Sequence, residues 1–191
     1  YERMIELTSL AERHLESGSR QSIAASVQFN PRSSDVAPVS HVAPILRGLI
    51  AGDDNKRMIL DFRSTPEVID FIGGAEAGRY AQAGPVTPDH VIRTKPKPLI
   101  LSTASTDELE IFKSEAASAI DQFRTDYQIY FARNNASQAT PKITLDSMPR
   151  VIMVPELGLF GLGNSSKAAA VAADLAETTV RVVTQAEGIG T

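Results

Sequence analysis

The sequence contains no cysteine, and this absence excludes disulfide bonds and metal sites built from thiolates. It also has no run of about 20 apolar residues, the length that a helix needs to cross a bilayer. Residues 1–17 carry charges throughout, which is not the pattern of a signal peptide. These three observations together lead us to expect a cytoplasmic protein that does not bind membranes.

An excess of positive charge is missing as well. The chain has 19 Lys and Arg against 23 Asp and Glu, a formal net charge of −4, and its basic residues are scattered. Nucleic acids and anionic lipids attract basic surfaces, so neither is an expected partner. With 191 residues and 42% hydrophobic residues, the chain can form one globular domain with a sizeable core.

The first 38 residues divide into a helix and a connecting segment. In residues 1–17, Met4, Leu7, Leu10 and Leu15 recur at helical spacing, with Glu and Arg on the opposite side. Residues 18–38 are rich in Ser, Pro and Asn without any period, which predicts a linker. Because the sequence begins inside a helical pattern and without Met, we expect it to be part of a longer protein.

Residues 39–191 alternate between helical and strand patterns, which predicts the α/β class. Thr65 followed by Pro66 is a strong helix start, and Ser40 is a candidate cap for another helix. A turn is expected at 53–55 and a loop at 135–149. Helices are expected at 41–52, 65–73, 75–83, 107–134 and 164–187, and strands at 56–62, 99–101 and 150–154.

The stretch from 150 to 170, "RVIMVPELGLFGLGNSSKAAA", predicts a strand, a glycine loop and a helix in that order. A dinucleotide-binding turn has this outline, which keeps a dinucleotide-binding segment of an oxidoreductase as the alternative function. The glycine spacing is reversed relative to G-x-G-x-x-G, however, and no second strand with an acidic residue follows. The simpler interpretation is that the glycines fit a tight turn between strand and helix.

Two motifs resemble those of zinc-dependent class II aldolases and their adducin relatives. The segment "E-L-G-L-F-G-L-G" (156–163) resembles the family's "N-H-G-L-F-x-x-G", with Leu157 at the zinc histidine. The segment "V-I-R-T-K-P" (91–96) resembles "V-x-H-T-H-S-P", with Arg93 and Lys95 at the other two histidines. The separation of 62 positions from Lys95 to Leu157 is close to the one in true aldolases. The resemblance implies a three-layer α/β/α fold of the class II aldolase kind.

The same comparison argues against a zinc site. Zinc needs neutral imidazoles or anionic ligands, which Arg, Leu and protonated Lys cannot supply. The three histidines of the chain, His14, His41 and His90, have no zinc-binding spacing. We therefore expect a degenerate aldolase domain without metal, a pseudo-active site, over residues 39–191.

A wider resemblance covers nearly the whole chain. It is similar to the middle region of bacterial bifunctional proteins that join a class II aldolase to a short-chain dehydrogenase, some called rhamnulose-1-phosphate aldolase/alcohol dehydrogenase. The similar pieces are residues 1–13, 47–62, 84–99, 127–134 and 149–163.

This resemblance implies a place in rhamnose-type sugar metabolism. Residues 1–17 would end an upstream aldolase domain, and residues 18–38 would link it to the middle domain. The partners implied are the upstream aldolase and downstream dehydrogenase domains of the same chain, together with a homo-oligomer. Zinc is expected in the upstream part, NAD in the downstream part, and no cofactor in this segment.

Two further sites are hypotheses from the residues. If "VIRTK" is a strand beside the glycine turn, Arg93 and Lys95 lie on one face and form an anion site with the backbone of Gly161, Gly163, Asn164 and Ser165. The alternative is that both cations are solvated or paired with a carboxylate such as Asp89. Asp89 and His90 also resemble an acid–base pair, although "TPD" is equally a capping or turn sequence. The expected role of the segment is therefore structural or anion-binding, without a complete catalytic site.

Overall fold

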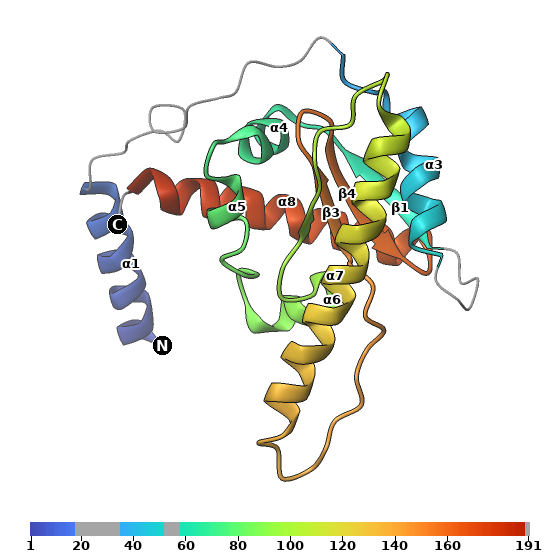
Figure 1. The fold of residues 1–191 in the computed structure, drawn as a ribbon. Helices are drawn as coiled ribbons and strands as arrows, with labels where there is room; N and C mark the ends of the chain where they lie inside the picture. Colours follow the sequence, from blue (N-terminus) through green and yellow to red (C-terminus); the bar gives the residue numbers. More distant parts are fainter. Residues whose placement is uncertain (18–34, 52–57, 190–191) are drawn as a thin grey trace.

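The computed structural model of the chain describes residues 1–17, 35–51 and 58–189 (Figure 1). The predicted turn at 53–55 and most of the predicted linker lie outside the described residues. The elements in chain order are α1 (Glu2–Ser17), α3 (Val39–Leu49), β1 (Ile59–Arg63), α4 (Pro66–Gly73), α5 (Ala77–Tyr80), the 3₁₀ helix η1 (Pro88–His90), α6 (Val91–Thr94), β2 (Leu99–Ile100), α7 (Leu109–Asn135), β3 (Val151–Val154), β4 (Gly158–Gly163) and α8 (Ser166–Ile189).

The strands form one mixed sheet in the order β1-β4-β3-β2. β2 runs parallel to β3, while β3 and β4 are an antiparallel hairpin, and β1 pairs antiparallel with the other side of β4. Helices alternate with strands along the chain, so the predicted α/β class is confirmed. No helix among the described residues is long and apolar enough to cross a membrane.

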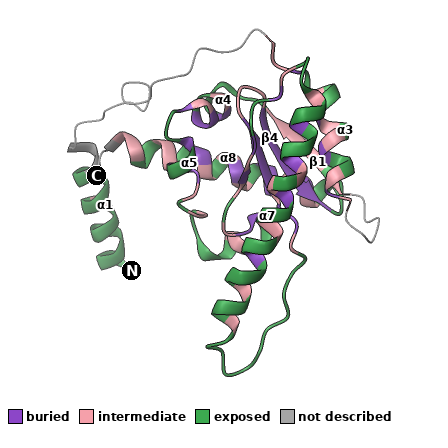
Figure 2. Ribbon diagram, in the orientation of Figure 1, coloured by how far each residue is buried: buried purple, intermediate pink, exposed green. Residues whose placement is uncertain are grey.

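The two central strands, β3 and β4, are buried along their whole length (Figure 2). Successive residues of a strand point to opposite faces, and β3 shows this alternation clearly. Ile152 and Val154 join a cluster with α3 and α7, whereas Val151 and Met153 join a second cluster with α4, α5 and α8. A continuous apolar run such as "VIMV" is the pattern expected of a strand covered on both faces.

Several helix boundaries follow local sequence signals. Thr65 caps α4 by accepting a hydrogen bond from the backbone N–H of Val68, and Pro66 occupies the first helical position, as predicted. The predicted cap at Ser40 is wrong, because α3 already begins at Val39 with Pro38 as its N-cap. Proline fixes the φ angle that a helix entry needs, and this start places Ser40 inside the first turn.

The predicted glycine loop is also wrong. Residues 158–163 are not a loop but strand β4, and the turn that precedes them is limited to Pro155–Leu157. Gly158 is required here, because its φ is +144° and a Cβ atom would lie 2.4 Å from the carbonyl oxygen of Arg63. The glycines of this strand serve close packing within the sheet and against α8.

The predicted strand over "VIRTK" is a helix instead. Val91–Thr94 form α6, directly after η1, and Lys95 ends it with a φ of +65°. Thr87 and Pro88 provide a helix start that outweighs the β propensity of the branched residues that follow.

The predicted helix at 1–17 is confirmed as α1. Its apolar residues Met4 and Leu10 are 61% and 57% exposed. The last residues of the predicted linker belong to the folded domain, since Ala37 is fully buried and its backbone N–H donates to the carbonyl of Ala104. Residues 18–34 lie outside the described residues, and the domain boundaries stay predictions.

Candidate functional site

A cleft lies at the carboxyl ends of the two parallel strands. It has a volume of about 590 Å³ and is bounded by the end of α4, the residues that follow β2 and the β3–β4 turn. In α/β proteins, ligands bind outside the carboxyl ends of parallel strands, and typical ligand sites have volumes of roughly 300–1,000 Å³. Position and size therefore make this cleft the best candidate site of the domain.

The polar groups of the cleft are hydroxyls and carboxylates. Ser102 and Thr103 come from the segment after β2, Asp70 from α4 and Glu156 from the turn. The Ser102 hydroxyl donates a hydrogen bond of 2.6 Å to Glu115 Oε2 on α7. Glu156 has a φ of +65°, a conformation that non-glycine residues rarely adopt and that often marks functional turns. The lining carries no basic side chain, so it does not select for anions.

A second segment of the chain contributes to this cleft. The segment "L-I-L-S-T-A-S" (99–105) runs out of β2, and its Ser102 and Thr103 line the same cleft as Pro155 and Glu156 of the turn. Its letters resemble "H-T-H-S", with Thr103 and Ser105 at the threonine and serine and with Ser102 and Ala104 at the two histidines. The T-x-S pattern after an apolar strand is the sequence signal from which this segment could have been recognised.

On this resemblance, the three histidine positions hold Ser102, Ala104 and Leu157. Ala104 is fully buried, and Leu157 packs against the α3–α7 cluster. None of these side chains offers the imidazole that zinc prefers. Across 1–17, 35–51 and 58–189, no group of three or more His, Asp or Glu is placed to hold a metal ion.

Lys95 lies elsewhere, inside the domain. Its side chain is among the fully buried ones, with 1% of the residue exposed. The ammonium Nζ donates to the backbone carbonyl of Asp146 and lies 3.6 Å from the ring centre of Tyr127, a cation–π contact. Burial lowers the pKa of Lys95 to about 8, with a contribution from the Arg150 charge, while the Asp146 carboxylate opposes the shift.

Asp146, which is exposed, and Arg150, which is half-buried, extend this cluster from buried Lys95 to the surface. Arg150 donates to both carboxylate oxygens of Asp146, at 3.0 Å from Nη1 to Oδ1. Burial acts to raise the pKa of Asp146, but the hydrogen bonds and the charges of Arg150 and Lys95 outweigh it and lower the pKa. The cluster holds the loop after α7 against the body of the domain, so its role in this geometry is structural.

The structure does not bring the predicted anion-binding residues together. Arg93 is exposed, whereas Lys95 is buried beside Ala176 and Thr179 in the middle of α8. Ser165 lies just before α8 begins, about 16 Å away along the helix at 1.5 Å per residue. Asn164 and Ser165 are exposed, and the Ser165 hydroxyl caps α8 by accepting from the N–H of Ala168.

Gly161 and Gly163 do not approach a ligand either. A Cβ atom on Gly161 would lie 2.5 Å from the Ala169 carbonyl oxygen, and one on Gly163 would lie 2.4 Å from the Ala169 nitrogen. Helix α8 therefore fills the space in front of both glycines. In a dinucleotide-binding turn, the phosphates occupy the space in front of the glycines. Because α8 fills that space here, the geometry does not support the dinucleotide alternative.

Asp89 and His90 lie in η1, away from the cleft. Asp89 is exposed, and the carbonyl of His90 accepts from the Thr94 hydroxyl at 3.0 Å. Within the described residues, the buried Nδ1 atom of His90 has no hydrogen-bond partner. Neither residue lines the cleft at the β3–β4 turn or the small cavity at Lys95, so nothing in the geometry pairs them around a substrate.

Comparison with known proteins agrees with the aldolase motifs. A family described as "Aldolase class II, second domain" matches residues 37–191. The chain is also similar to "Uncharacterized oxidoreductase YuxG" of Bacillus subtilis (strain 168), with 26% identity over 194 aligned residues. That alignment covers all of this chain but 27% of the relative, so the chain spans about a quarter of the relative's length. No solved structure matches the chain significantly.

Proposed function

Because the chain belongs to the family of class II aldolase second domains, we propose that it is a domain that keeps the aldolase hairpin and cleft without the zinc ligands. The observation that carries this proposal is the absence of imidazoles: Leu157 stands at one histidine position of the motifs, and neither Arg93 with Lys95 nor Ser102 with Ala104 supplies the other two. The domain therefore acts as a structural part of a larger enzyme. Its finer fold, in this proposal, is the three-layer arrangement of that family.

The chemistry of the donors supports this assignment. Zinc-dependent cleavage of a ketose phosphate needs a metal that polarises a carbonyl group. A serine hydroxyl and two aliphatic side chains cannot replace three imidazoles as ligands. The lining of the cleft also carries no Lys or Arg side chain that would bind the phosphate of such a substrate.

We place the domain in a bifunctional polypeptide that joins a sugar-phosphate aldolase to an NAD-dependent short-chain dehydrogenase. The name of the relative, an oxidoreductase several times longer than this chain, supports a redox partner domain. Helix α1 supports an upstream neighbour, because its apolar side chains Met4, Leu7 and Leu10 are exposed in the structure. In such a polypeptide, zinc would belong to the upstream aldolase part and NAD to the dehydrogenase part.

The coding sequence on either side of this segment tests the arrangement. We expect upstream aldolase motifs with their histidines and a downstream glycine fingerprint for dinucleotide binding. Neighbours of unrelated families on both sides would refute the bifunctional assignment.

Activity of the full polypeptide tests the structural role. Loss of a general acid or base lowers kcat by about 10²–10⁴-fold. We expect Ser102→Ala and Glu156→Gln to leave kcat for ketose-phosphate cleavage within about twofold, like the control Glu177→Gln on α8. A loss of a hundredfold or more in a folded Glu156→Gln protein would show that this cleft is catalytic.

A further inference from the structure

Strand β1 is an edge of the sheet. It pairs with β4 on one side, from Ile59 opposite Gly163 to Arg63 opposite Leu159. Among the described residues, no backbone hydrogen bond outside that ladder involves residues 59–63. An edge strand of this kind presents unpaired N–H and C=O groups and can accept a further strand.

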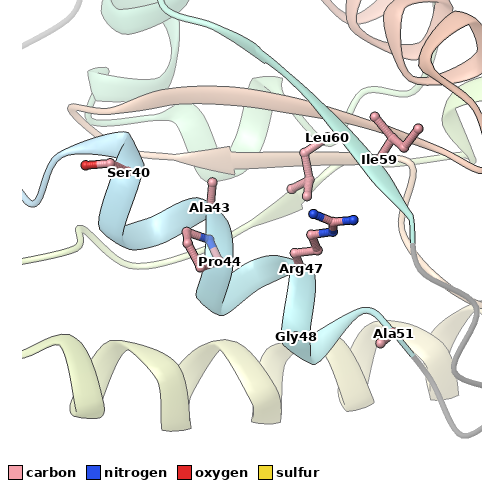
Figure 3. A pocket seen from close by; sticks show the side chains of 8 residues that line it. All are labelled: Ser40, Ala43, Pro44, Arg47, Gly48, Ala51, Ile59 and Leu60. Carbon is pink, nitrogen blue, oxygen red and sulfur yellow. The ribbon is translucent and has the colours of Figure 1, made fainter.

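A groove lies beside the first residues of this strand, Ile59 and Leu60, and helix α3 (Figure 3). Its volume is about 750 Å³. Most of the α3 side chains that line it are small, and a Cβ atom built on Gly48 would have no neighbour within 4 Å. Small side chains let another backbone approach the edge closely. The lining residues are Ser40, Ala43, Pro44, Arg47, Gly48, Ala51, Ile59 and Leu60.

Arg47 supplies the one charge in this lining. Its guanidinium extends from α3 toward Leu60 (Figure 3). In the part of the chain that the structure describes, Arg47 makes no ion pair or hydrogen bond, whereas Arg63 and Arg150 are both paired with carboxylates. A guanidinium over an apolar groove is best satisfied by a carboxylate, which it can bind through two parallel hydrogen bonds.

We infer that this groove accepts an extended strand from another protein or domain, with a carboxylate side chain that pairs with Arg47 while its backbone pairs with β1. The open row of backbone groups favours a strand over a helix or a small molecule. A second copy of β1 fits less well, because its one acidic residue, Asp61, already accepts a 2.7 Å hydrogen bond from Arg63. This inference does not depend on the function proposed above.

The test uses the isotope-labelled chain and a synthetic peptide of alternating Thr and Val with one central Glu, matched by the same peptide with Gln. We expect NMR shifts confined to the amides of residues 59–63 and to the Arg47 side chain, with dissociation constants of about 1 mM. The Glu peptide should bind up to about fivefold more tightly, as expected for a solvent-accessible ion pair.

Three variants locate the binding. Arg47→Gln should abolish the preference for Glu over Gln, and Gly48→Leu should weaken both peptides by filling the groove. The control Arg133→Gln, at the end of α7, should bind like the wild type. Circular dichroism verifies that each variant is folded.

Three outcomes would overturn the inference. The first is the absence of shifts in β1 with both peptides at about 10 mM, ten times the expected dissociation constant. The second is equal binding of the two peptides by the wild type. The third is self-association in sedimentation experiments that Gly48→Leu abolishes, since the occupant would then be a second copy of the chain.

Discussion

Replacement of Gly161 by alanine should strongly destabilise the domain. The added Cβ atom would lie 2.5 Å from the Ala169 carbonyl oxygen, 2.5 Å from the Ala173 nitrogen and 2.8 Å from the Ala173 Cβ. Two of these three atoms belong to the backbone of α8, so no side-chain rotation can relieve the contacts. Either α8 or strand β4 must move.

The size of the effect follows from that movement. Contacts of 2.5 Å must lengthen by about 1 Å to become ordinary, and a gap of that size forfeits roughly a quarter to a half of the dispersion energy across the interface. The interface is extensive, because Ala169, Ala173, Ala176 and Val180 of α8 are all buried against the sheet. Overpacking in cores typically costs 1–3 kcal/mol, and we expect about 3 kcal/mol here.

Urea unfolding followed by far-UV circular dichroism measures the loss of free energy of unfolding. Gly48→Ala is the matched control, since its Cβ atom would meet nothing within 4 Å and alanine favours a helix by roughly 0.5–1 kcal/mol. We therefore expect the two variants to change stability in opposite directions. A Gly161→Ala protein as stable as the wild type would refute the close approach of α8 to β4.

Three further predictions concern Lys95, Thr65 and NAD. Between pH 8 and 10.5, the amine of Lys95 keeps its proton in the unfolded chain but has lost it in the folded chain. The free energy of unfolding of the wild type should therefore rise with pH over this range by about 1 kcal/mol or more, relative to Lys95→Met. A difference between the two proteins that is constant with pH would contradict the burial of this amine. Thr65→Ala should cost about 1 kcal/mol in urea unfolding because α4 loses its cap, and Thr65→Ser should recover most of it. Calorimetry with NAD should give no measurable heat of binding, and micromolar affinity would restore the dinucleotide alternative.

The helices that local signals define were predictable from the sequence. The cap at Thr65 and the long pattern of α7 depend on neighbouring residues alone, and both were placed correctly. The glycine segment was not, because its glycines were interpreted as turn formers. These glycines are required because helix α8 packs closely against β4, and no local sequence pattern reveals this tertiary contact. The period of two in "G-L-F-G-L-G" was the available signal for a strand.

Only part of the candidate site could be predicted from the sequence. The turn before Gly158 was singled out from its motif, although the residues after it were predicted to be a loop and form strand β4, and the second motif was assigned to Arg93 and Lys95 by letter spacing alone. The structure brings Ser102 and Thr103 beside that turn instead, because they follow a strand that is parallel to β3. The groove at Arg47 could not be foreseen, since it depends on β1 lying at the edge of the sheet.

Elemental analysis of the chain, purified without chelators and exposed to zinc before desalting, tests the central claim most directly. With Ser102, Ala104 and Leu157 at the ligand positions, we predict zinc far below one equivalent per chain. Close to one equivalent of zinc, lost in the Glu156→Gln variant, would show that the cleft is a metal site and would contradict the account.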